Sequence, residues 1–118
     1  MRYSINKKLD AVLNCIESDI INVFCDYTDG KEDGSEIIEA IGWQKEMYPS
    51  ETDYNVAQHG NLLYYYSDIY KLYRNCGYKV TEKFSTEKIW QTYCRQVGYV
   101  CREILRRKDE FLSQFRNA

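Results

Sequence analysis

Proline and glycine are scarce in this chain of 118 residues. Pro49 is the one proline, and the six glycines lie mostly between periodic segments. Because both residue types interrupt helices, their scarcity favours long helices with few breaks. No run of alternating polar and apolar residues is long enough for a sheet. We expect an all-α fold, a compact bundle of four to five helices with short loops, in a single domain over residues 1–118.

Long apolar runs, paired cysteines and histidine are also lacking. No apolar run approaches the roughly 18 residues that a membrane span requires, and the N-terminus has no apolar segment of a signal peptide. The five cysteines are an odd number without a C-x-x-C pair, which favours reduced thiols in a cytosol. With His59 as the single histidine, a structural zinc site would lack ligands. We therefore expect a cytoplasmic protein with no metal and no cofactor.

Apolar residues recur at steps of three and four along several segments, as on one face of a helix. Ser4 is the expected N-cap of the first helix, and Ser35 is the expected N-cap of the second, which Pro49 ends. Gly77 is expected to close a tyrosine-rich helix, and the last helix is expected to start after Ser85 and to run close to the end of the chain. The first buried face is predicted to contain Ile5, Leu9, Val12, Leu13, Ile16, Ile20, Val23 and Phe24. The last is predicted to contain Ile89, Tyr93, Val97, Val100, Ile104, Phe111 and Phe115.

Residues 61–78 hold six of the twelve tyrosines. Consecutive helical residues point about 100° apart, so one core cannot take all the rings of residues 64–66. The helical phase places Tyr66, Tyr70 and Tyr73 in the core or at its boundary and turns Tyr64 away from it. Tyr64 is therefore a candidate partner-binding residue, since tyrosine is effective at interfaces; a single exposed ring is also ordinary.

The charges are unevenly distributed. Residues 1–59 hold twelve acidic and five basic residues, and residues 60–118 hold six acidic and eleven basic ones. The acidic half suggests a surface that imitates nucleic acid and occupies a basic groove of a partner; the alternative is a solvated loop and helix start. The candidate residues of this acidic surface are Asp26, Asp29, Glu32, Asp33, Glu36 and Glu39. Oppositely charged halves also allow a homodimer.

Basic residues recur every seven positions along the last helix, at Lys88, Arg95 and Arg102, with Arg106 beside them and Tyr99 between. We expect this stripe to be exposed, where it could follow a phosphate backbone. The alternative is an ordinary solvated helix face whose last-turn cations complement the helix dipole. Zinc-finger, phosphate-loop and RNA-recognition motifs are absent from the sequence.

No catalytic constellation emerges from the sequence. His59 would need a positioned partner and a nucleophile to act as a general base, and a histidine at a helix junction is more often a surface or capping residue. We therefore expect no enzymatic activity.

The stretch "DYNVAQHGNLLYYYSDIYKLYRNCGY" resembles segments of small uncharacterised proteins of bacteriophages and other mobile genetic elements, in which a short polar helix leads into a tyrosine-rich helix ending in Gly-Tyr. The resemblance implies a single-domain accessory protein that acts by binding, such as an anti-defence or host-modulating factor, and it implies no particular site residue. The sequence thus predicts a non-enzymatic protein-protein interaction protein, with a nucleic-acid-binding module as the alternative.

Overall fold

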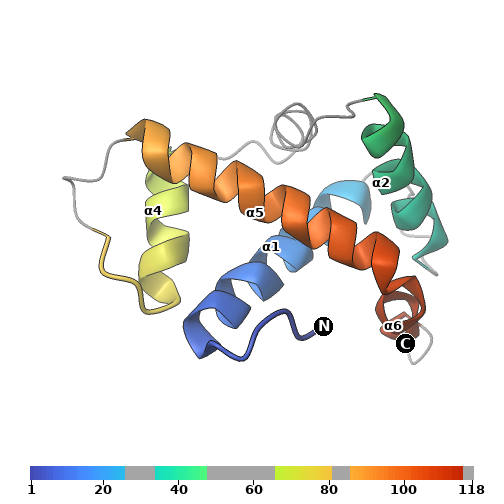
Figure 1. Ribbon diagram of the computed structural model, residues 1–118, viewed down its shortest axis with the longest axis horizontal. Coiled ribbons are helices and arrows are strands. Elements are labelled where there is room, and N and C mark those ends of the chain that lie inside the picture. The colour runs from blue at the N-terminus through green and yellow to red at the C-terminus, as the bar shows by residue number, and fades with distance from the viewer. Residues whose placement is uncertain (26–33, 48–65, 81–85, 116–118) are drawn as a thin grey trace.

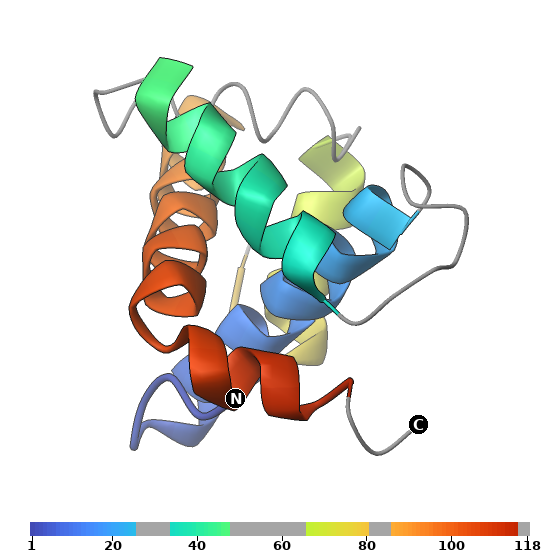
Figure 2. The same cartoon turned by 90° about the vertical axis from the view of Figure 1, so that its right-hand side faces the viewer.

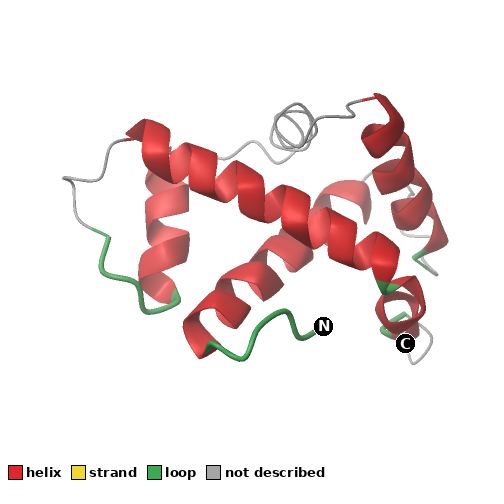
Figure 3. Cartoon of the chain, in the orientation of Figure 1, coloured by secondary structure: helices red, strands yellow, loops and turns green. Residues whose placement is uncertain are grey.

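The computed structural model describes residues 1–25, 34–47, 66–80 and 86–115, with the backbone alone at a few helix ends. These residues form helices, and no strand is present in the described ranges (Figures 1 and 3). The predicted all-α bundle is confirmed. The helices are α1 (Lys7–Cys25), α2 (Ser35–Met47), α4 (Tyr66–Asn75), α5 (Thr86–Arg106) and α6 (Lys108–Ser113).

Helix α5 is the centre of the bundle and contacts each of the other four described helices. In Figure 1, α4 lies at the beginning of α5, while α2 and α6 lie at its end. Its inward side chains follow the three- and four-residue spacing of the sequence, as predicted for an amphipathic helix. The buried residues of α5 are Ile89, Tyr93, Cys94, Val97, Val100, Cys101 and Ile104. All of them except Cys94 join Val12, Leu13, Ile16 and Ile20 of α1, Ile37 and Ile41 of α2, and Ile69 and Tyr73 of α4 in one hydrophobic cluster.

The start of α1 differs from the prediction. Asn6, and not Ser4, caps the helix, because its Oδ1 accepts hydrogen bonds from the backbone N–H groups of Lys8 at 3.0 Å and Leu9 at 3.1 Å. Ser4 lies before the helix, where its hydroxyl accepts from the N–H of Asn6. The predicted core position of Ile5 is also wrong, since this side chain is 89% exposed.

The side chain of Asp10 explains this difference. Its Oδ1 accepts hydrogen bonds from the backbone N–H groups of Tyr3 at 2.6 Å and Ser4 at 3.1 Å, which turns the first residues back along the bundle. These two bonds lower the pKa of the Asp10 carboxyl, because they stabilise its charged form. The turn places Tyr3 in the core in place of Ile5.

Helix α4 ends as predicted at Gly77, which has a φ of +98°. The N–H of Tyr78 donates to the carbonyl of Tyr73, and the N–H of Gly77 donates to that of Arg74, both at 3.0 Å. This pairing is the Schellman motif. The rings of Tyr73 and Tyr78 meet edge to face with centroids 6.0 Å apart, which supplies the apolar contact that accompanies the motif.

The predicted last helix is broken at Arg107, where the chain has a φ of −113° and a ψ of 40°. Helix α6 then turns sharply away from α5 (Figure 2), which brings Phe111 into the core. Its C-terminal end packs on the start of α2, where a Cβ added to Gly34 would lie 2.8 Å from the Phe115 ring. Gly34, and not Ser35, provides the first carbonyl acceptor of α2.

Candidate functional site

Helix α2 presents an acidic face that carries a large exposed aromatic ring. Glu36 and Glu39 are exposed, and Trp43 is 54% exposed. On a helix these three positions lie within about 60° of one another, on the side away from Ile37 and Ile41, which are fully buried. We call Glu36, Glu39 and Trp43 the α2 face. It combines negative charge with an apolar anchor.

The α2 face contains two of the six predicted acidic residues. The other four acidic candidates, Asp26, Asp29, Glu32 and Asp33, lie outside the described part of the chain. The tyrosine candidate Tyr64 and His59 lie outside it as well.

Trp43 was not among the residues predicted for partner binding, although a signal for it exists in the sequence. Trp43 lies two positions after the buried Ile41, and side chains two positions apart on a helix point about 200° away from each other. The same phase that buries Ile37 and Ile41 therefore turns Trp43 outward. Its hydrophobicity alone suggests the opposite, because a tryptophan is usually assigned to the core.

The basic stripe on α5 is exposed in part. Lys88, Arg95 and Arg106 are exposed, Tyr99 is 37% exposed, and Arg102 is half-buried. The ring of Tyr99 does not stand free, because it meets Tyr3 edge to face with centroids 6.4 Å apart.

A neighbouring carboxylate reduces the field of this stripe at Arg106. Arg106 donates two hydrogen bonds to Glu103 Oε2, at 2.6 Å from Nη2 and 3.1 Å from Nε. This pairing raises the pKa of the guanidinium and neutralises part of its charge. Arg95 donates from Nη2 to the hydroxyl of Thr92 at 3.5 Å, a neutral acceptor that leaves the charge of Arg95 in place. The stripe therefore offers a phosphate backbone less charge than its sequence spacing indicates.

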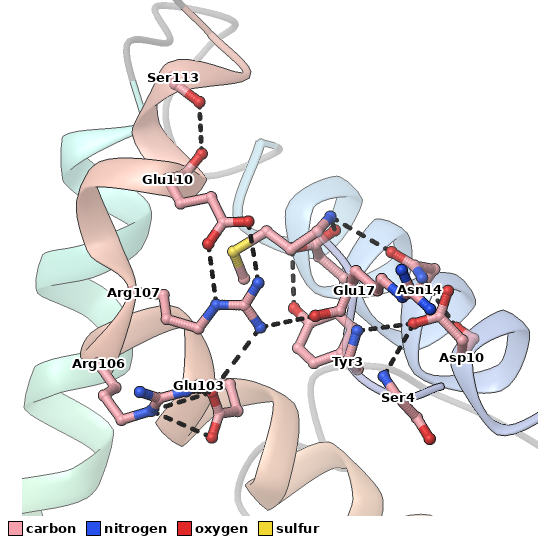
Figure 4. Close-up of polar contacts among 12 residues, drawn as sticks. Tyr3, Ser4, Asp10, Asn14, Glu17, Glu103, Arg106, Arg107, Glu110 and Ser113 are labelled. Carbon is pink, nitrogen blue, oxygen red and sulfur yellow. Dashed lines mark hydrogen bonds and ion pairs between the residues drawn. The ribbon is translucent and has the colours of Figure 1, made fainter. Parts of the chain in front are cut away.

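Among the described residues, the densest polar cluster joins the N-terminal segment to α1 and to the α5–α6 junction (Figure 4). Glu17 is 4% exposed; its carboxylate accepts a hydrogen bond from the hydroxyl of Tyr3 at 2.8 Å and pairs with the Met1 ammonium at 3.1 Å. Burial, followed by the charge of Glu17, raises the pKa of the Tyr3 phenol. The phenol therefore stays protonated and acts as a donor.

Arg107 completes this cluster from the other side. Its guanidinium donates to the carbonyl of Arg2 at 2.8 Å and to both carboxylate oxygens of Glu110, and it lies 5.8 Å from the centroid of the Tyr3 ring. Its contacts link the first residues of the chain to the α5–α6 junction. The arrangement acts as a structural clamp, because Glu17 and Arg107 hold the first residues of the chain from two sides.

A cavity of about 190 Å³ lies between the end of α4 and the beginning of α5. Its walls include Tyr73, Tyr78, Ile89 and Gln96, and the hydroxyl of Tyr73 donates a hydrogen bond to Gln96 Oε1. Burial raises the pKa of this phenol as well. The volume is below the roughly 300 Å³ typical of sites for drug-sized ligands, so the cavity fits a side chain better than a cofactor.

Within the described ranges, no group of three or more histidine, cysteine, aspartate or glutamate residues is arranged to hold a metal ion. Likewise, none of the described helices has both the length and the apolar character to cross a membrane.

Comparison of the chain with protein-family models, with curated proteins and with solved structures finds no match of any of the three kinds.

Proposed function

We propose that this protein is a non-enzymatic interaction protein that binds a partner protein through the α2 face. The observation that carries the proposal is the exposed indole of Trp43 beside Glu36 and Glu39 on one side of α2. Tryptophan is among the residues that dominate binding energy at interfaces, where the ring fills a pocket of the partner. Exposing so large a ring to water has no benefit for the folded chain by itself.

The chemistry of the α2 face defines the partner. Two carboxylates beside an apolar anchor fit a basic surface with an apolar pocket, since complementary charges favour encounter and correct orientation. The resemblance of residues 53–78 to proteins of bacteriophages and mobile elements supports an accessory role in the cytosol, such as an anti-defence or host-modulating factor. A second copy of this chain is the other partner to test, and sedimentation of the purified protein distinguishes it.

The experiment is affinity capture of a partner from host cells, followed by measurement of its dissociation constant with matched variants. Trp43→Ala is expected to weaken binding at least about 30-fold, the effect of removing a dominant interface residue. Glu36→Lys/Glu39→Lys is expected to weaken binding most at low salt. Ile5→Ala, which removes another exposed apolar side chain outside α2, serves as the control. Equal affinity of all these variants would refute the proposal.

The exposure of Lys88, Arg95 and Tyr99 on one side of α5 supports a second candidate, a nucleic-acid-binding module. Charge-driven binding weakens steeply between about 50 and 200 mM salt. Lys88→Gln/Arg95→Gln should reduce this salt dependence, and Lys71→Gln on α4 should not. Absence of binding to duplex DNA or RNA at the lower salt concentration would eliminate this candidate.

A further inference from the structure

The cavity between the end of α4 and the beginning of α5 has apolar walls of graded depth (Figure 1). Ile89 and Tyr73 line it and are only 5% and 6% exposed, so they lie at its deep end. Tyr78 and Val80 also line it and are half-buried, so they form its sides. An apolar group that enters the cavity is therefore shielded from water by both helices.

The charged residues of the cavity lining are basic and lie at its mouth. Lys79 and Lys88 line the cavity, and both are exposed. Lysine side chains extend their methylene groups along apolar surface and keep the ammonium group in water. None of the described lining residues is acidic. The nearby Glu87 accepts a hydrogen bond from the side chain of Gln91 at 3.3 Å. The mouth of the cavity therefore favours a negatively charged group.

The uncharged polar groups of the lining also suit an acceptor. The hydroxyl of Tyr73 donates to Gln96 Oε1, which occupies the acceptor atom of an amide whose Nε2 carries two donors. The hydroxyl of Thr92 donates to the backbone carbonyl of Lys88 at 2.9 Å. A carboxylate, which only accepts hydrogen bonds, fits such a lining better than an amine, which mainly donates them.

The side of the cavity that α4 contributes is fixed by the turn that ends this helix. The N–H of Tyr78 donates to the carbonyl of Tyr73 at 3.0 Å, and the N–H of Val80 donates to the carbonyl of Tyr78 at 3.2 Å. The rings of Tyr73 and Tyr78 are in edge-to-face contact. A wall that is ordered before binding spares a ligand the entropic cost of ordering it.

The volume of the cavity limits the size of its ligand. An engineered apolar cavity of about 150 Å³ binds benzene, and this cavity measures about 190 Å³. One six-membered ring with a small substituent therefore fits, and a nucleotide or a drug-sized molecule does not.

We propose that this cavity binds a small carboxylate that carries one apolar ring or a short branched apolar chain. The apolar part lies against Ile89, Tyr73 and Tyr78, since aromatic rings pack favourably edge to face. The carboxylate lies at the mouth, near the ammonium groups of Lys79 and Lys88. The proposal does not depend on the α2 face.

The test titrates the ¹⁵N-labelled chain with 4-methylbenzoate at pH 7 and follows the backbone amide signals by NMR. We expect saturable shifts centred on residues 78–80 and 88–96, with a dissociation constant of about 1 mM or below for so small a ligand. The neutral isostere 4-methylbenzamide should bind at least about 5-fold more weakly, because it loses the attraction of two exposed cations.

Two double variants separate the charge from the walls. Lys79→Gln/Lys88→Gln should reduce the affinity for 4-methylbenzoate to that for 4-methylbenzamide and leave the latter unchanged. Lys71→Gln/Lys108→Gln is the matched control, because it removes the same charge from exposed lysines outside the lining and should change neither affinity by more than about 2-fold.

A change in the wall should act on both probes. Tyr78→Ala removes one side of the cavity and should weaken 4-methylbenzoate and 4-methylbenzamide alike, while Tyr78→Phe, which keeps the ring, should bind both as the wild type does. Circular dichroism verifies that each variant is folded.

Absence of saturable shifts at these residues in the wild-type chain would overturn the proposal. Equal affinity for the two probes would also overturn it and would instead indicate a pocket for an apolar side chain of a partner protein. An unchanged affinity of Lys79→Gln/Lys88→Gln for 4-methylbenzoate would overturn the assignment of the carboxylate to the mouth.

Discussion

Replacing Glu17 tests whether the clamp between the N-terminal segment and the bundle stabilises the fold. In Glu17→Ala the Tyr3 hydroxyl loses its acceptor and the Met1 ammonium loses its counter-ion. The side chains of Met1 and Glu17 are only 1% and 6% exposed in the folded chain. A hydrogen bond to a charged group contributes about 1.5–3 kcal/mol. Removal of one partner of a buried ion pair costs about 3–5 kcal/mol.

The first residues can detach and return the ammonium to water, which limits the loss. We therefore expect Glu17→Ala to lower the free energy of unfolding by about 3 kcal/mol and the Tm by roughly 10 °C. Glu17→Gln keeps an acceptor for Tyr3 but no charge, so its cost should be about half as large. Tyr3→Phe should cost about 1–2 kcal/mol, and its effect should largely disappear in the Glu17→Ala background, since the two groups share one bond.

Urea unfolding at pH 7, followed by circular dichroism, measures these values. Ser18→Ala is the control, because Ser18 is the exposed neighbour of Glu17 on the same helix and surface substitutions usually change stability by less than about 0.5 kcal/mol. The reasoning fails if Glu17→Ala costs no more than Ser18→Ala. Additive effects of Tyr3→Phe and Glu17→Ala would show that the carboxylate acts without the phenol.

Two further predictions concern packing and pH. Gly34→Ala should destabilise the chain by about 2–3 kcal/mol in urea unfolding, because Gly34 has a φ of +86° and the new Cβ would lie 2.8 Å from Phe115; a cost below about 1 kcal/mol would contradict this packing. Stability should also fall at alkaline pH, because the folded pKa values of Tyr3, Tyr73 and Cys94 are raised. Such groups stabilise the fold fully below their unfolded pKa values, which lie near 10.0 for an ordinary tyrosine and near 9.0 for an ordinary cysteine. This contribution is lost as pH rises, at about 1.4 kcal/mol per pH unit for each proton. Tyr3→Phe and Tyr73→Phe should each flatten the decline above pH 10 in denaturation measured at successive pH values, and an unchanged slope would refute the assignment.

The buried faces of the helices were predictable because they depend on local spacing. Val97, Val100 and Ile104 are three and four positions apart, so any helix over them places their side chains on one side. The end of α4 was predictable for a similar reason, since Gly77 satisfies the conformation of its own turn.

The errors arise where a distant residue changes the outcome. Asn6 and Ser4 are both good N-caps by composition, and the bonds from Tyr3 and Ser4 to Asp10 decide between them. No glycine or proline lies near the break at Arg107, so the local sequence does not predict it. It accompanies a hydrogen bond from Arg107 to Arg2 and the burial of Phe111.

The candidate site also contains features that local spacing determines and features that depend on distant contacts. The spacing of residues along α2 predicts that Glu36, Glu39 and Trp43 point outward, although the sequence analysis did not assign the Trp43 ring to a binding surface. The reduced field of the α5 stripe depends partly on the Arg106–Glu103 pair, which the i, i+3 spacing allows. The half-buried state of Arg102 depends on the packing around it.

The sequence by itself determined the helices, their apolar sides and the unequal charge of the two halves, because spacing of three and four residues and the identity of each side chain are local properties. The tertiary structure alone decided where the N-terminal segment lies and where the last helix breaks. Each of these depends on contacts between residues widely separated along the chain, whose stabilisation exists only once the helices have packed together.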